Sequence, residues 1–282
     1  PFEYHKHFDV QSHGYRPVGG FYPDNSIGWY RKHFTVDKDN QEKRFVLRFE
    51  GVYRDFKVWI NNNYIGSTFS GYSESSFDIT DFIEFSKDNV IVVRVDASQY
   101  EGWFYEGAGI YRNVSLETLN PVHIPEYGVY VSANLEQSKA LVNAQTSVKN
   151  QEGKTVECAV VSYVIDSKGT KMTKSFTEKL TVKNNEIGKV SQNLSLKNPE
   201  LWGLDSPNLY RLVSIVKKNG ITTDSTQTEF GVRTFNYDSE KGFSLNGKSM
   251  KVKGMCVHQD HAGVGSAVPD ALVFYRIKLL KE

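Results

Sequence analysis

Short runs with alternating apolar positions dominate the first 120 residues of the chain. In the clearest of them, residues 44–49, the apolar side of the alternation consists of Phe45, Leu47 and Phe49. Turn signals separate these runs, among them three consecutive asparagines at 61–63, a residue type that tolerates the left-handed backbone conformation. Many short strands divided by turns are typical of an all-β sandwich or jelly roll. We therefore predict such a domain over residues 1–121.

The same alternation continues at smaller scale over residues 122–233. Seven strand-like runs follow one another there, and the turns between them are rich in Asn, Asp and Gly. About seven short strands in roughly 100 residues is the size of an immunoglobulin-like sandwich. Because the cysteine-tryptophan-cysteine core of antibody domains is missing, the prediction is of the wider immunoglobulin-like class.

The pattern changes again over residues 234–282. Asn246-Gly247 predicts a hairpin turn, and the run at 250–255 predicts a further strand. Pro269 and Asp270 indicate a helix start. Helical spacing places Leu272, Tyr275 and Leu279 on its apolar side and leaves Arg276, Lys278 and Lys281 for water. One strand, one loop and one helix form a single β/α unit, whereas a (β/α)8 barrel needs about 250 residues. The predicted fold class is mostly β, with two sandwiches followed by the first unit of an incomplete TIM barrel.

Charge and composition narrow the function classes. The 34 basic and 33 acidic side chains nearly cancel, so the sequence does not favour a nucleic-acid partner. No apolar run is long enough to cross a bilayer, and the first residues lack the apolar core of a signal peptide, so no membrane partner is predicted. Cys158 and Cys256 lie in different predicted domains without metal-ligand or redox spacing, and we predict two free thiols.

Titratable side chains concentrate in residues 251–265, where His258, Asp260 and His261 lie among glycines. Imidazole and carboxylate groups are metal ligands, but two adjacent residues on a loop make a poor chelate without further ligands. Hydrogen bonds that fix the loop are the preferred interpretation of Asp260 and His261. We predict neither a metal nor a cofactor.

Four stretches then carry a resemblance that covers nearly the whole chain. They are Gly28-Trp-Tyr-Arg-Lys-His-Phe34 with residues 48–61, Gly107-Ala-Gly-Ile-Tyr-Arg-Asn-Val114, residues 198–210 with Phe230-Gly-Val-Arg233, and residues 243–248 with Lys253-Gly-Met-Cys-Val-His-Gln-Asp-His261. In this order they resemble the N-terminal part of glycoside hydrolase family 2, the family of β-galactosidases, β-glucuronidases and β-mannosidases. The resemblance implies that the first domain is a galactose-binding-like jelly roll. Four ordered matches make a more specific signal than any one of them.

The resemblance implies retaining hydrolysis of a β-glycoside by two glutamates, one protonating the leaving oxygen and one attacking the anomeric carbon. In the family both glutamates lie on later barrel strands. Neither position exists in these 282 residues, so no catalytic residue is assigned and the chain by itself is expected to be inactive.

The resemblance also suggests where substrate is contacted. His258 stands where the family places a histidine that hydrogen-bonds the bound sugar, and Asp260 lies beside it; Cys256 stands where some relatives carry asparagine. The loop at 101–106 corresponds to one that reaches toward the barrel mouth, so Trp103 is expected to stack on a sugar and Glu101 or Glu106 to accept hydroxyl hydrogen bonds. An interdomain contact packed by aromatics is the alternative for this loop. Some relatives have a sodium-binding aspartate where Trp103 stands, so no such ion is expected.

The preferred hypothesis is therefore the N-terminal region of a β-glycosidase, most like a bacterial β-galactosidase, with a β-linked oligosaccharide or glycoside as its partner. A non-catalytic carbohydrate-binding or adhesive sandwich protein is the alternative, against which the β/α unit argues. A homo-oligomer is compatible with the sequence, and the compartment stays open between bacterial periplasm and cytoplasm.

Overall fold

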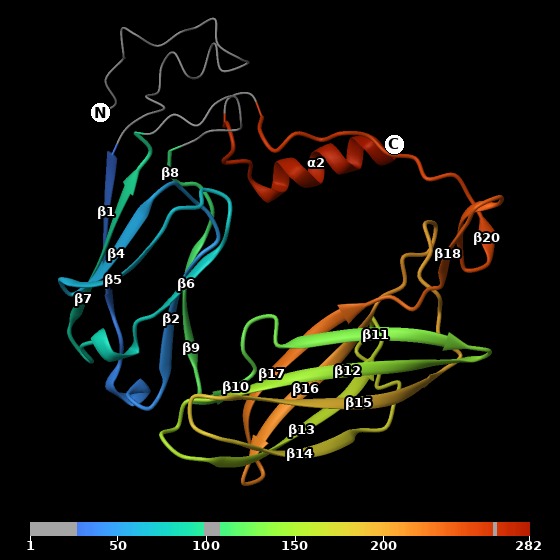
Figure 1. The fold of residues 1–282 in the computed structure, drawn as a ribbon, viewed down its shortest axis with the longest axis horizontal. Coiled ribbons are helices and arrows are strands. Elements are labelled where there is room, and N and C mark those ends of the chain that lie inside the picture. The colour runs from blue at the N-terminus through green and yellow to red at the C-terminus, as the bar shows by residue number, and fades with distance from the viewer. Residues whose placement is uncertain (1–26, 99–107, 262–263) are drawn as a thin grey trace, which may run out of the picture. The chain divides into compact units, whose positions relative to one another are not determined.

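The computed structural model describes residues 27–98, 108–261 and 264–282. Within these residues the strands form two sandwiches, β1 to β9 and β10 to β17, followed by a three-stranded hairpin sheet and the helix α2 (Figure 1). The mostly β fold is as predicted. The chain divides into two compact units, one of Pro1–Thr118 with Met255–Glu282 and one of Leu119–Gly254.

The first sandwich consists of short antiparallel strands. They are β1 Ile27–Thr35, β2 Arg44–Phe49, β3 Val52–Tyr53, β4 Phe56–Ile60, β5 Asn63–Thr68, β6 Ser75–Asp78, β7 Asp88–Asp96, β8 Gly109–Ile110 and β9 Val114–Leu119, with single 3-10 turns at Lys38–Asn40 and Thr80–Phe82. One sheet has the order β1-β7-β4-β5, another β6-β2-β9, and β3 pairs with β8. The alternating run predicted from the sequence is β2, whose Phe45, Leu47 and Phe49 all lie in the core.

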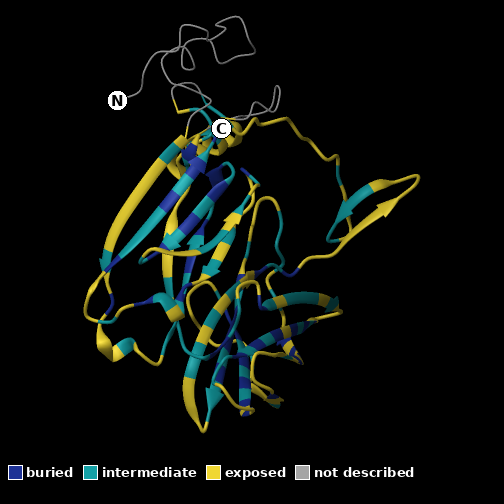
Figure 2. Ribbon diagram, turned by 60° about the vertical axis from the view of Figure 1, so that its left-hand side comes forward, coloured by how far each residue is buried: buried dark blue, intermediate teal, exposed yellow. Residues whose placement is uncertain are grey.

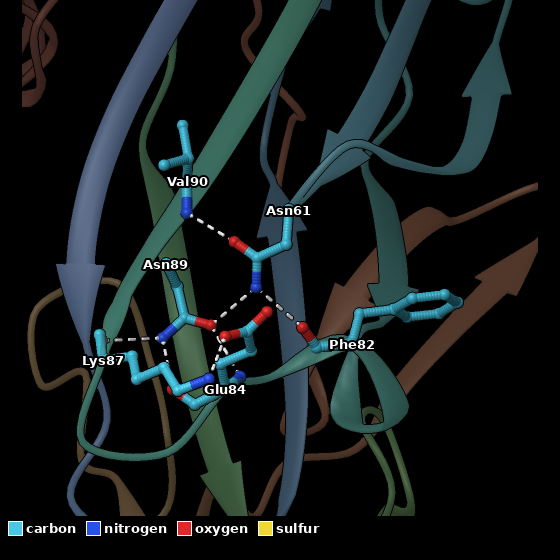
Figure 3. A network of polar contacts seen from close by, with 6 residues as sticks. All are labelled: Asn61, Phe82, Glu84, Lys87, Asn89 and Val90. Carbon is cyan, nitrogen blue, oxygen red and sulfur yellow. Dashed lines mark hydrogen bonds and ion pairs between the residues drawn. The ribbon is translucent and has the colours of Figure 1, made fainter.

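A network of buried amides fixes one end of this sandwich (Figure 3). The Asn89 side chain donates to the carbonyl oxygens of Glu84 and Lys87, at 2.8 and 3.2 Å, and accepts from the Glu84 amide and the Asn61 side chain, each at 2.8 Å. Asn61 adopts a left-handed φ of 48°, and its side chain also accepts from the Val90 amide. The asparagine turn predicted at 61–63 is therefore held by an amide 28 residues away in the sequence.

Replacing Asn89 by alanine is expected to lower the free energy of unfolding by about 2 kcal/mol, because the buried partners of its amide lose their hydrogen bonds. Urea denaturation followed by circular dichroism measures the change. Asn143→Ala, which removes a surface amide bonded to Asn193, is the matched control and should change stability by less than about 1 kcal/mol. Equal effects of the two substitutions would contradict a structural role for the network.

The second sandwich has longer strands. They are β10 Val122–His123, β11 Val129–Glu136, β12 Lys139–Asn150, β13 Val156–Ile165, β14 Phe176–Val182, β15 Ile187–Lys197, β16 Tyr210–Lys218 and β17 Ile221–Phe230. One sheet contains β10, β11 and β15 around β12, and the other has the order β14-β13-β16-β17. Buried and more exposed residues alternate along these strands (Figure 2), and the buried sides form two apolar clusters between the sheets. The seven predicted strands are present, joined by the short β10.

The hairpin after the second sandwich matches its predicted turn. β18 Phe235–Asp238, β19 Gly242–Leu245 and β20 Lys248–Ser249 form one small sheet, and Asn246 and Gly247 have φ values of 52° and 76°. The strand predicted at residues 250–255 is not observed, because no described strand pairs with residues 250–260. A strand needs neighbours that accept and donate its backbone hydrogen bonds, and an apolar run alone does not supply them.

The helix α2 spans Asp270–Lys281, with Pro269 as its N-cap, in agreement with the predicted start. Its burial differs from the prediction. No residue of α2 is buried, and Leu272 and Arg276 are half-buried whereas Tyr275 and Leu279 are exposed. Two of the three residues on the predicted apolar side are therefore exposed, whereas Arg276, which was predicted to face water, is half-buried.

Candidate functional site

The candidate site residues His258 and Asp260 lie in the irregular segment that precedes α2. This segment ends in a tight turn in which the His261 amide donates to the Gly265 carbonyl at 3.1 Å and the Gly265 amide donates to the His261 carbonyl at 2.9 Å. Gly265 has a φ of 56°, a conformation that costs glycine little. His258 is exposed and Asp260 and His261 are half-buried, so the imidazole of His258 is accessible to a ligand.

Arg276 of α2 holds this loop through its backbone. Its guanidinium donates to the carbonyl oxygen of Asp260 at 2.7 Å and to that of His258 at 3.3 Å. The planar guanidinium suits two acceptors side by side, because its donors form a rigid fork. Loop-fixing hydrogen bonds were expected from the side chains of Asp260 and His261, and the sequence interpretation missed the contribution of Arg276. The sequence signal for a contact by Arg276 was its spacing of four residues from Leu272. Residues i and i+4 share a helix face, so Arg276 lies on the same side of α2 as a predicted apolar residue.

The described residues do not bring together a metal site. No group of three or more His, Cys, Asp or Glu side chains lies close enough to hold an ion within residues 27–98, 108–261 and 264–282. Both cysteines are free thiols, as predicted, with Cys158 buried and Cys256 exposed. Burial raises the pKa of the Cys158 thiol, so this side chain stays in the less reactive protonated form at neutral pH.

Glu101 and Trp103, the other two candidate residues, lie outside the described residues. The structure does define the two ends of the segment that carries them. At the first end, Asp96 accepts hydrogen bonds from the hydroxyl and amide of Ser98 and pairs with Arg94 at 2.7 Å. At the second end, Gly109 has a φ of 98°, and a Cβ there would lie 2.2 Å from the hydroxyl oxygen of Tyr30. Both ends are therefore tightly constrained.

The backbone of residues 54 and 55 lies beside Asp96. The Asp96 amide donates to the carbonyl oxygens of Arg54 and Asp55 at 3.1 and 3.2 Å, and Asp55 adopts a φ of 42°. Tyr53 is buried and its ring meets Tyr72 edge-on at 5.6 Å. These observations indicate a packing role for Tyr53 and for the backbone of the other two residues.

The Asp96 carboxylate should make stability depend on pH in acid. The Ser98 hydroxyl and amide, followed by the Arg94 guanidinium, hold the pKa of Asp96 at about 2, below its ordinary value of 3.8. A depressed folded-state pKa stabilises the fold above about pH 4, and this stabilisation is lost as the pH falls toward 2. Asp96→Asn should therefore have a lower melting temperature than the parent at pH 7, with a difference that shrinks between pH 4 and 2. A difference in melting temperature that stays constant between pH 4 and 2 would show that the Asp96 charge is not its cause.

A pocket of about 590 Å³ lies in the second unit, between the end of the second sandwich and the hairpin sheet. Trp202, Arg233, Phe235, Tyr237 and Lys251 are among its lining residues. The Arg233 guanidinium lies 4.7 Å from the Trp202 ring, a cation–π contact, and the Trp202 carbonyl accepts from the Asn246 side chain at 2.9 Å. Trp202 thus connects the sandwich to the hairpin, whereas Tyr210 is buried in the sandwich core.

Two family models match this arrangement in chain order. Residues 20–120 match the model described as "Glycosyl hydrolases family 2, sugar binding domain", and residues 122–233 match "Glycosyl hydrolases family 2". The chain belongs to glycosyl hydrolases family 2. Both sandwiches are family 2 domains, and the resemblance predicted from the four sequence stretches is confirmed.

Curated relatives with similar sequences include two named glycosidases. The β-galactosidase BoGH2A of Bacteroides ovatus is 36% identical over 266 residues, covering 94% of this chain and 31% of the relative. A β-glucuronidase of Formosa agariphila is 30% identical over 299 residues, covering 98% of this chain and 30% of the relative. The chain therefore spans about a third of the length of these family 2 relatives.

Solved structures of family 2 proteins share the fold. A family 2 member from Bacteroides cellulosilyticus superimposes with a TM-score of 0.86 at 32% identity, covering 93% of this chain and 34% of the other. A β-glucuronidase from Bacteroides uniformis gives a TM-score of 0.82 at 27% identity, covering 91% and 32%. Within the described part of this family 2 chain, no helix has the length and apolarity needed to cross a membrane.

Proposed function

We propose that this chain is the N-terminal region of a retaining exo-β-glycosidase that removes terminal β-linked sugars, with β-galactosidase as the favoured activity. The observation that carries the proposal is the order of parts. Two family 2 domains are followed directly by a hairpin, the Arg276-braced loop of His258, and a helix. The 36% identity to a β-galactosidase supports the choice of sugar.

In this proposal the reaction is a double displacement by two glutamates located beyond residue 282. One protonates the leaving oxygen while the other attacks the anomeric carbon, their carboxyl groups about 5–5.5 Å apart, and water then releases the sugar from the covalent intermediate. The residues of this chain bind and orient the sugar. The His258 imidazole can donate and accept hydrogen bonds with sugar hydroxyls at neutral pH, and Asp260 accepts them. Trp103 and Glu101 would add stacking and a hydroxyl contact.

Uncovered apolar surface in residues 250–282 supports a catalytic barrel that starts near residue 234. Val252, Met255 and Val257 are exposed in the segment without strand partners, and Phe274 and Ile277 are exposed on α2. Soluble proteins seldom leave so many large apolar side chains uncovered in one segment. Further strands and helices of a barrel would pair with residues 250–255 and cover this surface. The proposed domain limits accordingly remain 1–121, 122–233 and 234–282.

Hydrolysis assays test the function. The 282-residue chain and a chain extended through a full barrel would be assayed with nitrophenyl β-galactoside, β-glucuronide and β-mannoside. We expect turnover by the extended chain, fastest on the galactoside, and none by the 282-residue chain. Strong turnover by the short chain would refute the assignment of both glutamates to later residues.

The same assays decide between sugars. The β-glucuronidases of Formosa agariphila and Bacteroides uniformis make glucuronide the second candidate, and a preference of the extended chain for the glucuronide would select it. Absence of turnover on all three substrates, together with saturable sugar binding measured by calorimetry, would instead favour a non-catalytic carbohydrate-binding protein.

A further inference from the structure

Three aromatic side chains contact one another on the first sandwich, away from its core. The rings of Trp29 on β1 and Trp59 on β4 stack with centroids 5.8 Å apart and an interplanar angle of 28°. The ring of Tyr64 on β5 lies 5.7 Å from Trp59. We call Trp29, Trp59 and Tyr64 the aromatic platform.

Strand register places the platform on the outer face of the sheet β1-β7-β4-β5. Phe56, Val58 and Ile60 of β4 are buried in the core, so alternation turns Lys57 and Trp59 to the opposite face. Trp29 pairs with Arg94 of β7, whereas Trp59 pairs with Val92 of the same strand. The two indoles therefore reach toward each other across β7, which lies between their strands.

The platform is accessible to a ligand. Trp29 is 63% exposed and Tyr64 is 53% exposed, both large values for amphipathic rings that gain free energy from burial. A contiguous exposed aromatic surface on a folded domain marks an interaction site more often than isolated apolar residues do. The second sandwich also exposes a tyrosine, Tyr130, but the described residues place no ring against it.

Two basic side chains flank the platform. Arg31 and Lys57 lie on the same outer face, two residues from Trp29 and Trp59 respectively, and neither forms an ion pair within the described residues. Arg94, between the indoles, is already paired with Asp96 at 2.7 Å. The described part of this face thus offers two cations with unused charge next to exposed aromatic rings.

We propose that this face binds an acidic polysaccharide. The apolar C–H faces of pyranose rings would stack on Trp29 and Tyr64, and carboxylate or sulfate groups would pair with Arg31 and Lys57. A nucleic acid fits less well, because its affinity depends on many contacts between phosphates and basic side chains, whereas of the described residues only Arg31 and Lys57 flank the platform with unpaired charge. A second copy of the chain also fits less well, because a stable interface buries about 800 Å² per partner and three rings supply only part of that area.

Such a surface would hold the enzyme on a polymer while another site acts on chain ends. It uses no residue of the proposed catalytic region, so it stands or falls independently of the proposed glycosidase activity. A bound polymer raises the local concentration of its own ends, which is the general benefit of a second binding module.

The test uses the 282-residue chain in affinity electrophoresis and calorimetry. The gels contain polygalacturonate, dextran sulfate or neutral galactan, so that carboxylate, sulfate and uncharged polymers are compared. We expect retardation by one or both acidic polymers and weaker retardation by galactan. Trp29→Ala and Tyr64→Ala should each weaken binding about tenfold. Arg31→Gln and Lys57→Gln should weaken it and flatten its dependence on salt, because each removes a screened charge contact.

Matched controls separate binding from folding. Tyr130→Ala removes a tyrosine that is also 63% exposed and should leave binding unchanged. Thermal unfolding should show every variant folded at the assay temperature. The stacked indoles of Trp29 and Trp59 are expected to give an exciton signal in far-UV circular dichroism. Tyr64→Ala should keep this signal, so lost binding in that variant would not reflect loss of the stack.

Four results with the polysaccharides and the variants would overturn the proposal, and a fifth would come from a nucleic-acid comparison. They are absence of retardation by both acidic polymers, equal retardation by galactan, equal loss of affinity in Tyr130→Ala, and a dimer in analytical ultracentrifugation that dissociates on Trp29→Ala. The last result would identify a second copy as the occupant. Tighter binding of a single-stranded oligonucleotide than of either acidic polymer at the same salt would also contradict it.

Discussion

Replacing Phe49 by alanine is expected to lower the free energy of unfolding of the first sandwich by about 3–5 kcal/mol. Phe49 is 1% exposed and lies on β2, and its ring packs against Phe56 at 5.1 Å and Phe77 at 6.1 Å. Phe56 belongs to the other sheet, so the ring of Phe49 joins the two layers. Its removal takes away apolar contacts and leaves a cavity between sheets that cannot collapse fully, since each is held by its own hydrogen bonds.

Urea denaturation with circular dichroism and tryptophan fluorescence measures this loss. Phe69→Ala is the matched control, because Phe69 is 74% exposed and the same truncation there should cost less than about 1 kcal/mol. Similar midpoints for Phe49→Ala and Phe69→Ala would show that the space between the sheets is not the main source of stability in this domain.

Replacing Arg276 by alanine in a chain extended through the proposed barrel is expected to lower kcat/KM about 100-fold, or ~2.7 kcal/mol. Its guanidinium bonds the carbonyl oxygens of His258 and Asp260, so its loss frees the backbone that carries the proposed sugar contact. Arg276→Lys should recover part of the activity, because an ammonium can bond one carbonyl but lacks the fork that spans two. This graded rescue distinguishes positioning from a general loss of folding.

Lys278→Ala is the control on the same helix, since Lys278 is exposed and pairs at 3.7 Å with Glu282. In the 282-residue chain, Arg276→Ala should speed hydrogen exchange of the His261 and Gly265 amides, which bond across the adjacent turn. Unchanged hydrogen exchange in Arg276→Ala would refute the bracing role.

His258→Ala in the extended chain should raise KM and keep the fold. An unchanged KM and an unchanged rate for this variant would remove His258 from the site.

Much of the fold followed from local patterns. The alternation at 44–49 identified β2 and its core residues, because a strand turns successive side chains to opposite faces wherever it pairs. The Asn246-Gly247 turn was predictable because both residue types tolerate a positive φ. The start of α2 was predictable from the residue types that suit a helix N-terminus. The family resemblance was carried by such local stretches as well.

The candidate site was less predictable. His258 and Asp260 were identified through the resemblance. The spacing of Arg276 from Leu272 indicates a shared helix face, but it does not specify that the guanidinium bonds the carbonyl oxygens of the His258 loop. The predicted strand at 250–255 failed for the related reason that pairing partners, not apolar composition, make a strand. Trp29 and Trp59 of the platform lie on β1 and β4 with β7 between them, an order that no local pattern specifies.

The sequence by itself therefore determined the class of the protein: two β-sandwich domains of family 2 followed by a hairpin and a helix. Each of these depends on side-chain periodicity and turn chemistry within a few residues. Only the tertiary structure decided that β7 lies between β1 and β4, that Asn61 bonds Asn89, and that Arg276 braces the His258 loop. The physical reason is that these contacts join residues far apart in the chain, whose pairing is selected by the burial and hydrogen bonding of the whole domain.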